Sequence, residues 1–126
     1  MTSLAFWEEL RALGPPLHGV HGNMDEPALR ELLPKQAVVE IEEARIGLVH
    51  VPGPAAGRAG RLRAKFPGCA AVIYGHTHVP EAVQEDGAWI LNPGSPTERR
   101  KSPAHTMLVL AVGGSQVAPK FVRLDP

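Results

Sequence analysis

The residues best suited to chemistry lie in the tetrapeptide Gly75-His76-Thr77-His78. It follows the apolar run 70–74, which is typical of a strand buried on both faces. Two imidazoles separated by one residue in an extended segment point to the same side, and the preceding glycine lets the backbone approach a ligand closely. This spacing suits two ligands of one metal cluster. The alternative is that both histidines cap the strand and bond to the backbone.

Two further polar residues follow runs that are typical of strands. His50 comes directly after the run 45–49 and leads into a Gly/Pro loop. Asn23 lies in a turn after the short apolar run 17–21, and its amide oxygen can bind a hard cation or a phosphate oxygen. The carboxyl ends of parallel strands meet at one edge of a sheet, where ligands converge. The candidate metal ligands are therefore Asn23, His50, His76 and His78.

Each of these residues also has an ordinary structural interpretation. By itself, His50 suits a surface or hydrogen-bonded position, and Asn23 suits a left-handed turn before a helix. A short charge run, Glu98 to Lys101, suits either a solvated loop or a rim that attracts anions. His18 and His21 are interpreted as structural or surface residues. The metal hypothesis depends on several strand ends carrying ligands together.

The elements that must position these residues follow from periodicity and turn signals. Helices are predicted over about 3–13, 26–33 and 55–66, and strands over about 17–21, 37–41, 45–49, 70–74, 81–85, 88–91, 106–112 and 117–123. This mixed order predicts an α/β or α+β sandwich of sheets flanked by helices. No internal repeat or linker divides the chain, so residues 1–126 are expected to form a single domain.

Composition narrows the class of protein. Hydrophobic residues make up 44% of the 126 residues, charged residues make up 21%, and the formal net charge is zero, so nothing indicates a nucleic-acid or membrane partner. A single cysteine, Cys69, permits neither an intrachain disulfide nor a cysteine-based zinc cluster. The sequence shows neither a signal peptide nor a membrane span, so a cytoplasmic location is expected.

The order and spacing of four motifs resemble the later motifs of the calcineurin-like metallophosphoesterases. The motifs are Gly22-Asn23-Met24-Asp25, His50, Gly75-His76-Thr77-His78 and Asn92-Pro93-Gly94-Ser95. The likeness is greatest to the small branch of YfcE-type phosphodiesterases and Vps29-type retromer subunits. It implies an α/β fold, a sandwich of two mixed β-sheets flanked by helices, with two divalent metals (manganese, zinc or nickel) at the strand ends.

The same resemblance assigns roles to the candidate residues. Asn23, His50 and His76 would bind the second metal, and His78 would bind the first. Asn23, His76 and His78 would also be the catalytic residues. The turn from Asn92 to Ser95 is expected to be structural rather than catalytic.

The sequence also departs from the family pattern. It contains neither the Asp-x-His pair that binds the first metal nor the Gly-Asp that bridges both metals. The first strand of the family is therefore expected to be missing, through a fragment, a misplaced start or a true loss. Met24 stands where many relatives carry a histidine as general acid, and a thioether cannot protonate a leaving group. Val51 follows His50 where the family usually has glycine.

The resemblance implies a metal-dependent phosphoesterase that hydrolyses a small phosphate ester, in particular a phosphodiester, with a metal-bound hydroxide. The missing ligands imply that this activity is impaired in the chain as given. The alternatives are a non-catalytic, Vps29-like interaction scaffold and a mononuclear metal-binding protein. A missing first strand would leave a sheet edge unpaired, which favours a homo-oligomer. The natural substrate and the preferred metal are not specified by the sequence.

Overall fold

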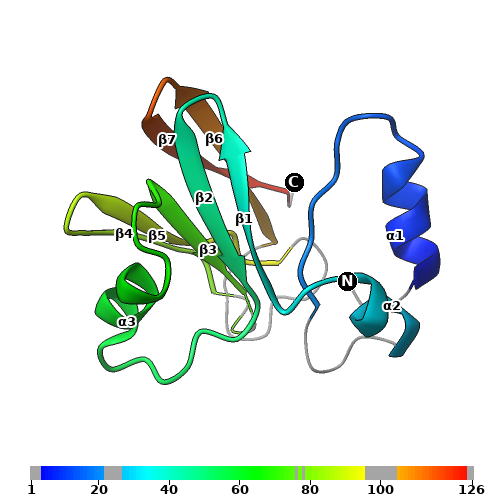
Figure 1. The fold of residues 1–126 in the computed structure, drawn as a ribbon, viewed down its shortest axis with the longest axis horizontal. Coiled ribbons are helices and arrows are strands. Elements are labelled where there is room, and N and C mark those ends of the chain that lie inside the picture. The colour runs from blue at the N-terminus through cyan, green and yellow to red at the C-terminus, as the bar shows by residue number, and fades with distance from the viewer. Residues whose placement is uncertain (1–3, 22–26, 76, 78, 96–104, 125–126) are drawn as a thin grey trace.

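A computed structural model describes residues 4–21, 27–75, 77, 79–95 and 105–124 (Figure 1). Its elements are α1 (Leu4–Arg11), α2 (Pro27–Leu32), β1 (Gln36–Ile41), β2 (Ala44–Val49), α3 (Arg58–Lys65), β3 (Ala71–Tyr74), β4 (Glu81–Glu85), β5 (Ala88–Asn92), β6 (Thr106–Gly113) and β7 (Gln116–Arg123). All three predicted helices are present, as is every predicted strand from residue 37 onward. The third helix begins later than predicted because Gly57, with φ 70°, forms a turn before it.

Five strands form a mixed sheet in the order β1-β2-β3-β5-β4. The three central strands are parallel, with β2 beside β3 and β3 beside β5, and the edge strands β1 and β4 are antiparallel to their neighbours. The parallel arrangement brings the carboxyl ends of β2, β3 and β5 to one edge of the sheet. This is the edge where the candidate ligands were expected to meet.

The alternation of side chains along β3 divides the core between the two faces of this sheet. Val72 and Tyr74 pack on one face with Leu62 and Phe66, which belong to α3 or directly follow it. The opposite face carries Ala71, with apolar side chains of the second sheet packed against it: Leu108, Leu110, Val112 and Val117. The sheet is thus covered by a helix on one side and by β6 and β7 on the other.

The second sheet is an antiparallel pair, β6 with β7, in the part of the chain that the structure describes. Its strands alternate between half-buried and exposed residues along most of their length, as expected for a ribbon with one face on a core. The predicted fold class, an α/β sandwich of two sheets with flanking helices, is confirmed. None of the described helices is long and apolar enough to cross a membrane.

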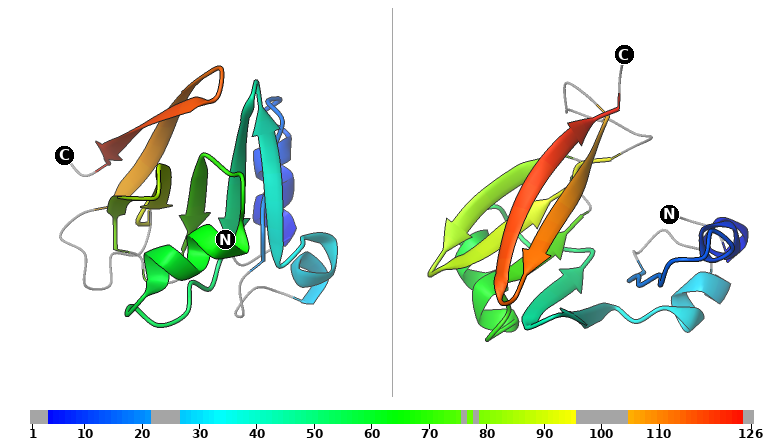
Figure 2. Two further views of the ribbon diagram at one scale, coloured as in Figure 1. Left: turned by 60° about the vertical axis from the view of Figure 1, so that its left-hand side comes forward. Right: turned by 90° about the horizontal axis from the view of Figure 1, so that it is seen from above.

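The N-terminal helices lie away from the sheet face that α3 covers. Both α1 and α2 lie on the opposite side of the molecule from α3 (Figures 1 and 2). They have a small core of their own, in which Trp7 and Leu33 pack with Leu4 and Leu17. The ring of Trp7 also lies directly against Gly19, where a Cβ would be 2.7 Å from the nearest ring carbon.

The strand predicted over residues 17–21 is wrong, because these residues have no strand conformation. A strand requires a ladder partner, and the backbone bond found here is from His21 N–H to the Pro34 carbonyl, at 3.0 Å. Leu17 packs with the N-terminal helical cluster rather than on a sheet. A short apolar run suits either environment, so its composition alone could not identify a strand.

Candidate metal site at the ends of β2 and β3

The structure brings His50 against the start of the Gly-His-Thr-His loop. Val49 lies opposite Tyr74 in the parallel ladder, so β2 and β3 end at the same level. The next residues are His50 and Gly75, and the Gly75 N–H donates to the His50 carbonyl at 3.2 Å. A Cβ on Gly75 would lie 3.3 Å from His50 Nδ1, so the imidazole packs closely against this glycine. His50 therefore lies beside Gly75, the first residue of this loop.

The other three predicted ligands, Asn23, His76 and His78, lie outside the described residues. Their roles therefore stay predictions. Within the described ranges no three His, Cys, Asp or Glu side chains form a group that could hold a metal. The chemistry of the full predicted set fits a divalent metal, because imidazole nitrogens suit zinc and nickel and an amide oxygen adds a harder ligand.

A buried asparagine holds the loop between the two predicted histidine ligands. Asn92, which is 0% exposed, donates from Nδ2 to Thr77 Oγ1 at 2.9 Å. Its Oδ1 accepts the Gly94 N–H at 2.9 Å. Thr77 Oγ1 also accepts the Val79 N–H at 3.3 Å, and the Thr77 N–H donates to the Gly75 carbonyl at 2.9 Å. Asn92 thus fixes Thr77, the residue between His76 and His78.

Sequence reasoning treated Asn92 as part of a structural turn and missed its bond to Thr77. The order of the strands could have indicated this bond. Asn92 ends a strand that pairs in parallel with β3, so it reaches the same sheet edge as the Gly-His-Thr-His loop. A polar residue at the end of a buried strand needs a partner, and the nearest loop supplies one.

The turn after Asn92 joins this edge to the second sheet. The Thr106 hydroxyl donates to the Pro93 carbonyl at 2.8 Å, and the Thr106 N–H donates to the Ser95 carbonyl at 3.0 Å. Gly94 has φ 77°, and a Cβ there would overlap Thr106 Oγ1. Glycine is therefore required at this position for two reasons, its left-handed backbone and the lack of space.

The loop after His50 is held by arginines of α3. Arg61 donates from Nη1 to the Ala56 carbonyl at 2.8 Å, and from Nη2 to the Pro54 and Pro52 carbonyls at 2.6 and 3.2 Å. Arg58 Nη2 donates to the Gly53 carbonyl at 3.0 Å. These bonds fix a loop that has valine directly after His50. The sequence predicted this helix but not this role of its arginines.

Tyr74, the last residue of β3, donates its hydroxyl to Glu81 Oε1. The Arg58 guanidinium carbon lies 5.3 Å from the centre of its ring. Burial, followed by the bond to Glu81, raises the pKa of Tyr74 to about 12. Tyr74 is therefore neutral near pH 7 and supports the strand end as a hydrogen-bond donor rather than as a base.

The remaining sequence candidates do not join this arrangement in the described residues. His18 is exposed, whereas His21 is half-buried and has a partner of its own. The charge run from Glu98 to Lys101 lies outside the described residues.

A comparison against known families identifies the superfamily of the chain. The family model of the calcineurin-like phosphoesterase superfamily domain matches residues 1–115. The chain therefore belongs to this superfamily. A probable metallophosphoesterase of Methanothermobacter thermautotrophicus is 34% identical over 125 residues, which are 98% of this chain and 71% of that protein. A second, from Methanocaldococcus jannaschii, is 38% identical over 96 residues, which are 74% of this chain and 47% of that protein.

Solved structures show the same fold. The solution NMR structure of a Thermotoga maritima protein has a TM-score of 0.71 and 31% identity, covering 96% of this chain and 74% of that one. Vps29 of Entamoeba histolytica, solved with Zn²⁺, has a TM-score of 0.72 and 26% identity, covering 98% of this chain and 77% of that one. This similarity extends to a protein whose structure contains a divalent metal.

Proposed function

We propose that this chain supplies the histidine-bearing part of a divalent-metal site that hydrolyses small phosphate esters, in particular phosphodiesters. The observation that carries the proposal is the packing of His50 against Gly75 at the paired ends of β2 and β3. The next residues along the chain are the predicted ligands of the Gly-His-Thr-His loop. Membership of the calcineurin-like phosphoesterase superfamily supports the reaction class.

In this proposal Asn23, His50 and His76 hold one divalent ion, and His78 is a ligand of a second. The metals, when bound, would supply Lewis-acid polarisation of the phosphoryl oxygens and a water of lowered pKa. The chain's own residues position these ligands. Asn92 holds Thr77 by a 2.9 Å hydrogen bond, and the arginines of α3 hold the loop that follows His50.

We further propose that turnover by the chain as given is low. The sequence has neither an Asp-x-His pair nor a Gly-Asp, so the proposed first metal would have His78 as its ligand from these motifs. Working catalytic zinc sites use about three protein ligands. Met24 cannot act as a general acid because its thioether carries no proton to transfer.

The test compares this chain with a version extended at its N-terminus by a strand that carries Asp-x-His and then Gly-Asp. A matched control carries the same extension with alanine at the ligand positions. All three are assayed with Mn²⁺ or Zn²⁺ and bis(p-nitrophenyl) phosphate. Loss of a single outer-shell partner lowers activity by about 10- to 100-fold, so restoring direct ligands should raise turnover by at least about 100-fold. Equal turnover by all three versions would overturn the proposed impairment.

The second candidate is a non-catalytic scaffold that binds a metal or a protein partner. The similarity to Vps29 favours it, and it requires no complete binuclear site. The same assay distinguishes the two candidates. A scaffold or a mononuclear metal-binding protein would take up Zn²⁺ without measurable turnover, even with the restored ligands.

A further inference from the structure

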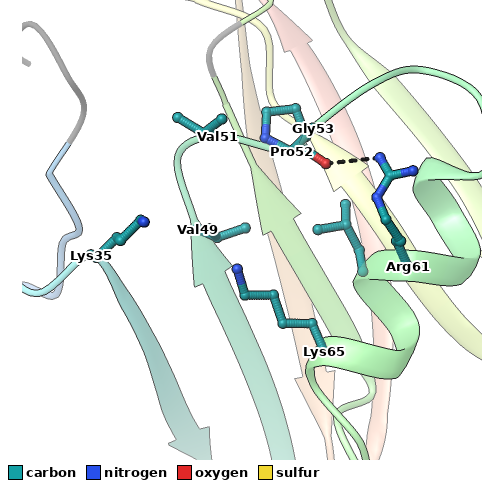
Figure 3. A pocket seen from close by; sticks show the side chains of 8 residues that line it. Lys35, Val49, Val51, Pro52, Gly53, Arg61 and Lys65 are labelled. Carbon is teal, nitrogen blue, oxygen red and sulfur yellow. Dashed lines mark hydrogen bonds between the residues drawn. The ribbon is translucent and has the colours of Figure 1, made fainter.

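A second site lies on the helix-covered side of the sheet, where α3 faces the end of β2 and the segment before β1 (Figure 3). The cavity has a volume of about 480 Å³ and is lined by Lys35, Val49, Val51, Pro52, Gly53, Arg61, Leu62 and Lys65. This volume falls in the range of about 300–1,000 Å³ that is usual for small-molecule sites. His50 is not among the lining residues.

The described charged residues of this cavity are all basic. Lys35 comes from the segment before β1, and Arg61 and Lys65 come from successive turns of α3. Among the residues that the structure describes, the lining includes no carboxylate, whereas the chain as a whole has a formal net charge of zero. A cavity lined by charge of one sign raises the local concentration of the opposite ion, so this one should attract anions.

The basic side chains of this cavity fall into two groups. Arg61 holds the loop after His50, whereas Lys35 and Lys65 can contact a ligand. Arg61 donates to the carbonyls of Ala56, Pro52 and Pro54, so its hydrogen-bonding capacity is largely used. The ion pairs found among the described residues involve neither Lys35 nor Lys65. Figure 3 shows the two lysines extending toward the cavity from opposite sides, with Val49 between them.

The rest of the lining is apolar. Val51 is 38% exposed and offers apolar surface to a ligand, whereas Val49, Leu62 and Pro52 are buried. Such a surface favours an organic group, whereas the lysines favour an anion above it. A fully hydrated inorganic ion would use the charges but not this apolar surface.

We propose that this cavity binds a small organic phosphate, with its anionic group between Lys35 and Lys65 and its apolar body against Val51. Two ammonium groups from separate elements can donate to one phosphate, and each charge-assisted hydrogen bond adds to the affinity. The site requires no metal, so it does not depend on the proposed phosphoesterase chemistry. Its rim, Val51 to Gly53, directly follows His50, so a ligand here contacts the loop that leaves the candidate metal site.

The test uses metal-free protein and phenylphosphonate, which cannot be hydrolysed at an ester bond. Backbone amide shifts are followed by NMR, and affinity is measured by calorimetry. The amides of Val51, Gly53, Leu62 and Lys65 should move together at one dissociation constant. Lys35→Ala and Lys65→Ala should each weaken binding by about tenfold, the effect of losing a hydrogen bond to a charged group.

Lys120→Ala is the matched control, because Lys120 is an exposed lysine on β7 and does not line the cavity. It should leave the affinity unchanged, and inorganic phosphate should bind more weakly than phenylphosphonate. Equal weakening by all three lysine variants would mean general attraction to positive charge and would overturn the proposal. Equal affinity for phenylphosphonate and inorganic phosphate would overturn the assignment of an organic ligand. All affected side chains are exposed, and unchanged circular dichroism spectra would show that each variant is folded.

Discussion

The mixed sheet and the helical segment before it are held together in different ways. In the sheet, parallel ladders fix the ends of β2 and β3 and two apolar clusters cover the faces. The described parts of the segment before β1, residues 4–21 and 27–35, have a small cluster around Trp7 and Leu33, and the backbone bond from His21 to Pro34 joins these two parts to each other. Strand pairing therefore fixes the position of His50, whereas no described strand pairing fixes the segment that leads to Asn23.

This difference divides the candidate site. The histidine part belongs to a sheet whose register determines which residues meet, as His50 and Gly75 do. The asparagine part follows a segment that pairs with no described strand. A metal bound by both parts would link the two regions. A measurement of metal binding therefore tests the candidate site more directly than a measurement of folding does.

The largest expected effect comes from two glycines with positive φ, one in each region. Gly94→Ala should lower the free energy of unfolding by about 3 kcal/mol, because the added Cβ overlaps Thr106 Oγ1 in a left-handed backbone. Gly14→Ala should cost only about 1 kcal/mol, because its φ is also positive but no atom lies within 4 Å of the added Cβ. Urea unfolding of both variants measures the difference. Equal losses would contradict the close packing of the Asn92–Thr106 turn.

A smaller effect is expected from the buried asparagine. Asn92→Leu should cost about 2 kcal/mol, because it leaves the Gly94 N–H without its acceptor and Thr77 without its donor. It should also weaken Zn²⁺ binding by about 10- to 100-fold if Asn92 orients the loop that carries the predicted ligands.

Thr77→Val and the double variant complete a thermodynamic cycle for this pair. The two substitutions should be non-additive, because they remove the same 2.9 Å hydrogen bond. Strict additivity, or unchanged Zn²⁺ affinity in Asn92→Leu, would show that Asn92 stabilises only the turn.

Most of the sheet could be predicted from the sequence, whereas the irregular conformation of residues 17–21 and the supporting bonds could not. The run 70–74 is apolar and ends in a glycine turn, and the motif spacing identified the family. The run 17–21 is equally apolar, but its conformation depends on a ladder partner rather than on its own composition. The bond from Asn92 to Thr77 joins residues 15 positions apart, so only the fold reveals it. The Arg61 bonds span five to nine residues, but they depend on how the loop turns back over α3, which its composition does not specify.

The smallest effect is a dependence of stability on high pH. Tyr74 has its pKa raised to about 12 in the folded protein, above the ordinary value of 10.0 in the unfolded chain. The neutral form is favoured by folding, so this contribution is complete below pH 10.0 and is lost as the pH rises toward about 12. Tyr74→Phe should flatten this part of the stability profile, measured by urea unfolding. An unchanged slope in the variant would mean that another group causes the loss.

Zn²⁺ titration of the chain by calorimetry tests the central claim most directly, namely that His50 and the Gly-His-Thr-His loop bind one metal. His50→Ala and His76→Ala should each weaken Zn²⁺ binding by at least about tenfold, because each removes an imidazole from a site with few ligands. His18→Ala is the control, since His18 is exposed and is not a predicted ligand. The claim predicts that the His18→Ala curve matches that of the unaltered chain, whereas the same curve for all three variants would contradict it.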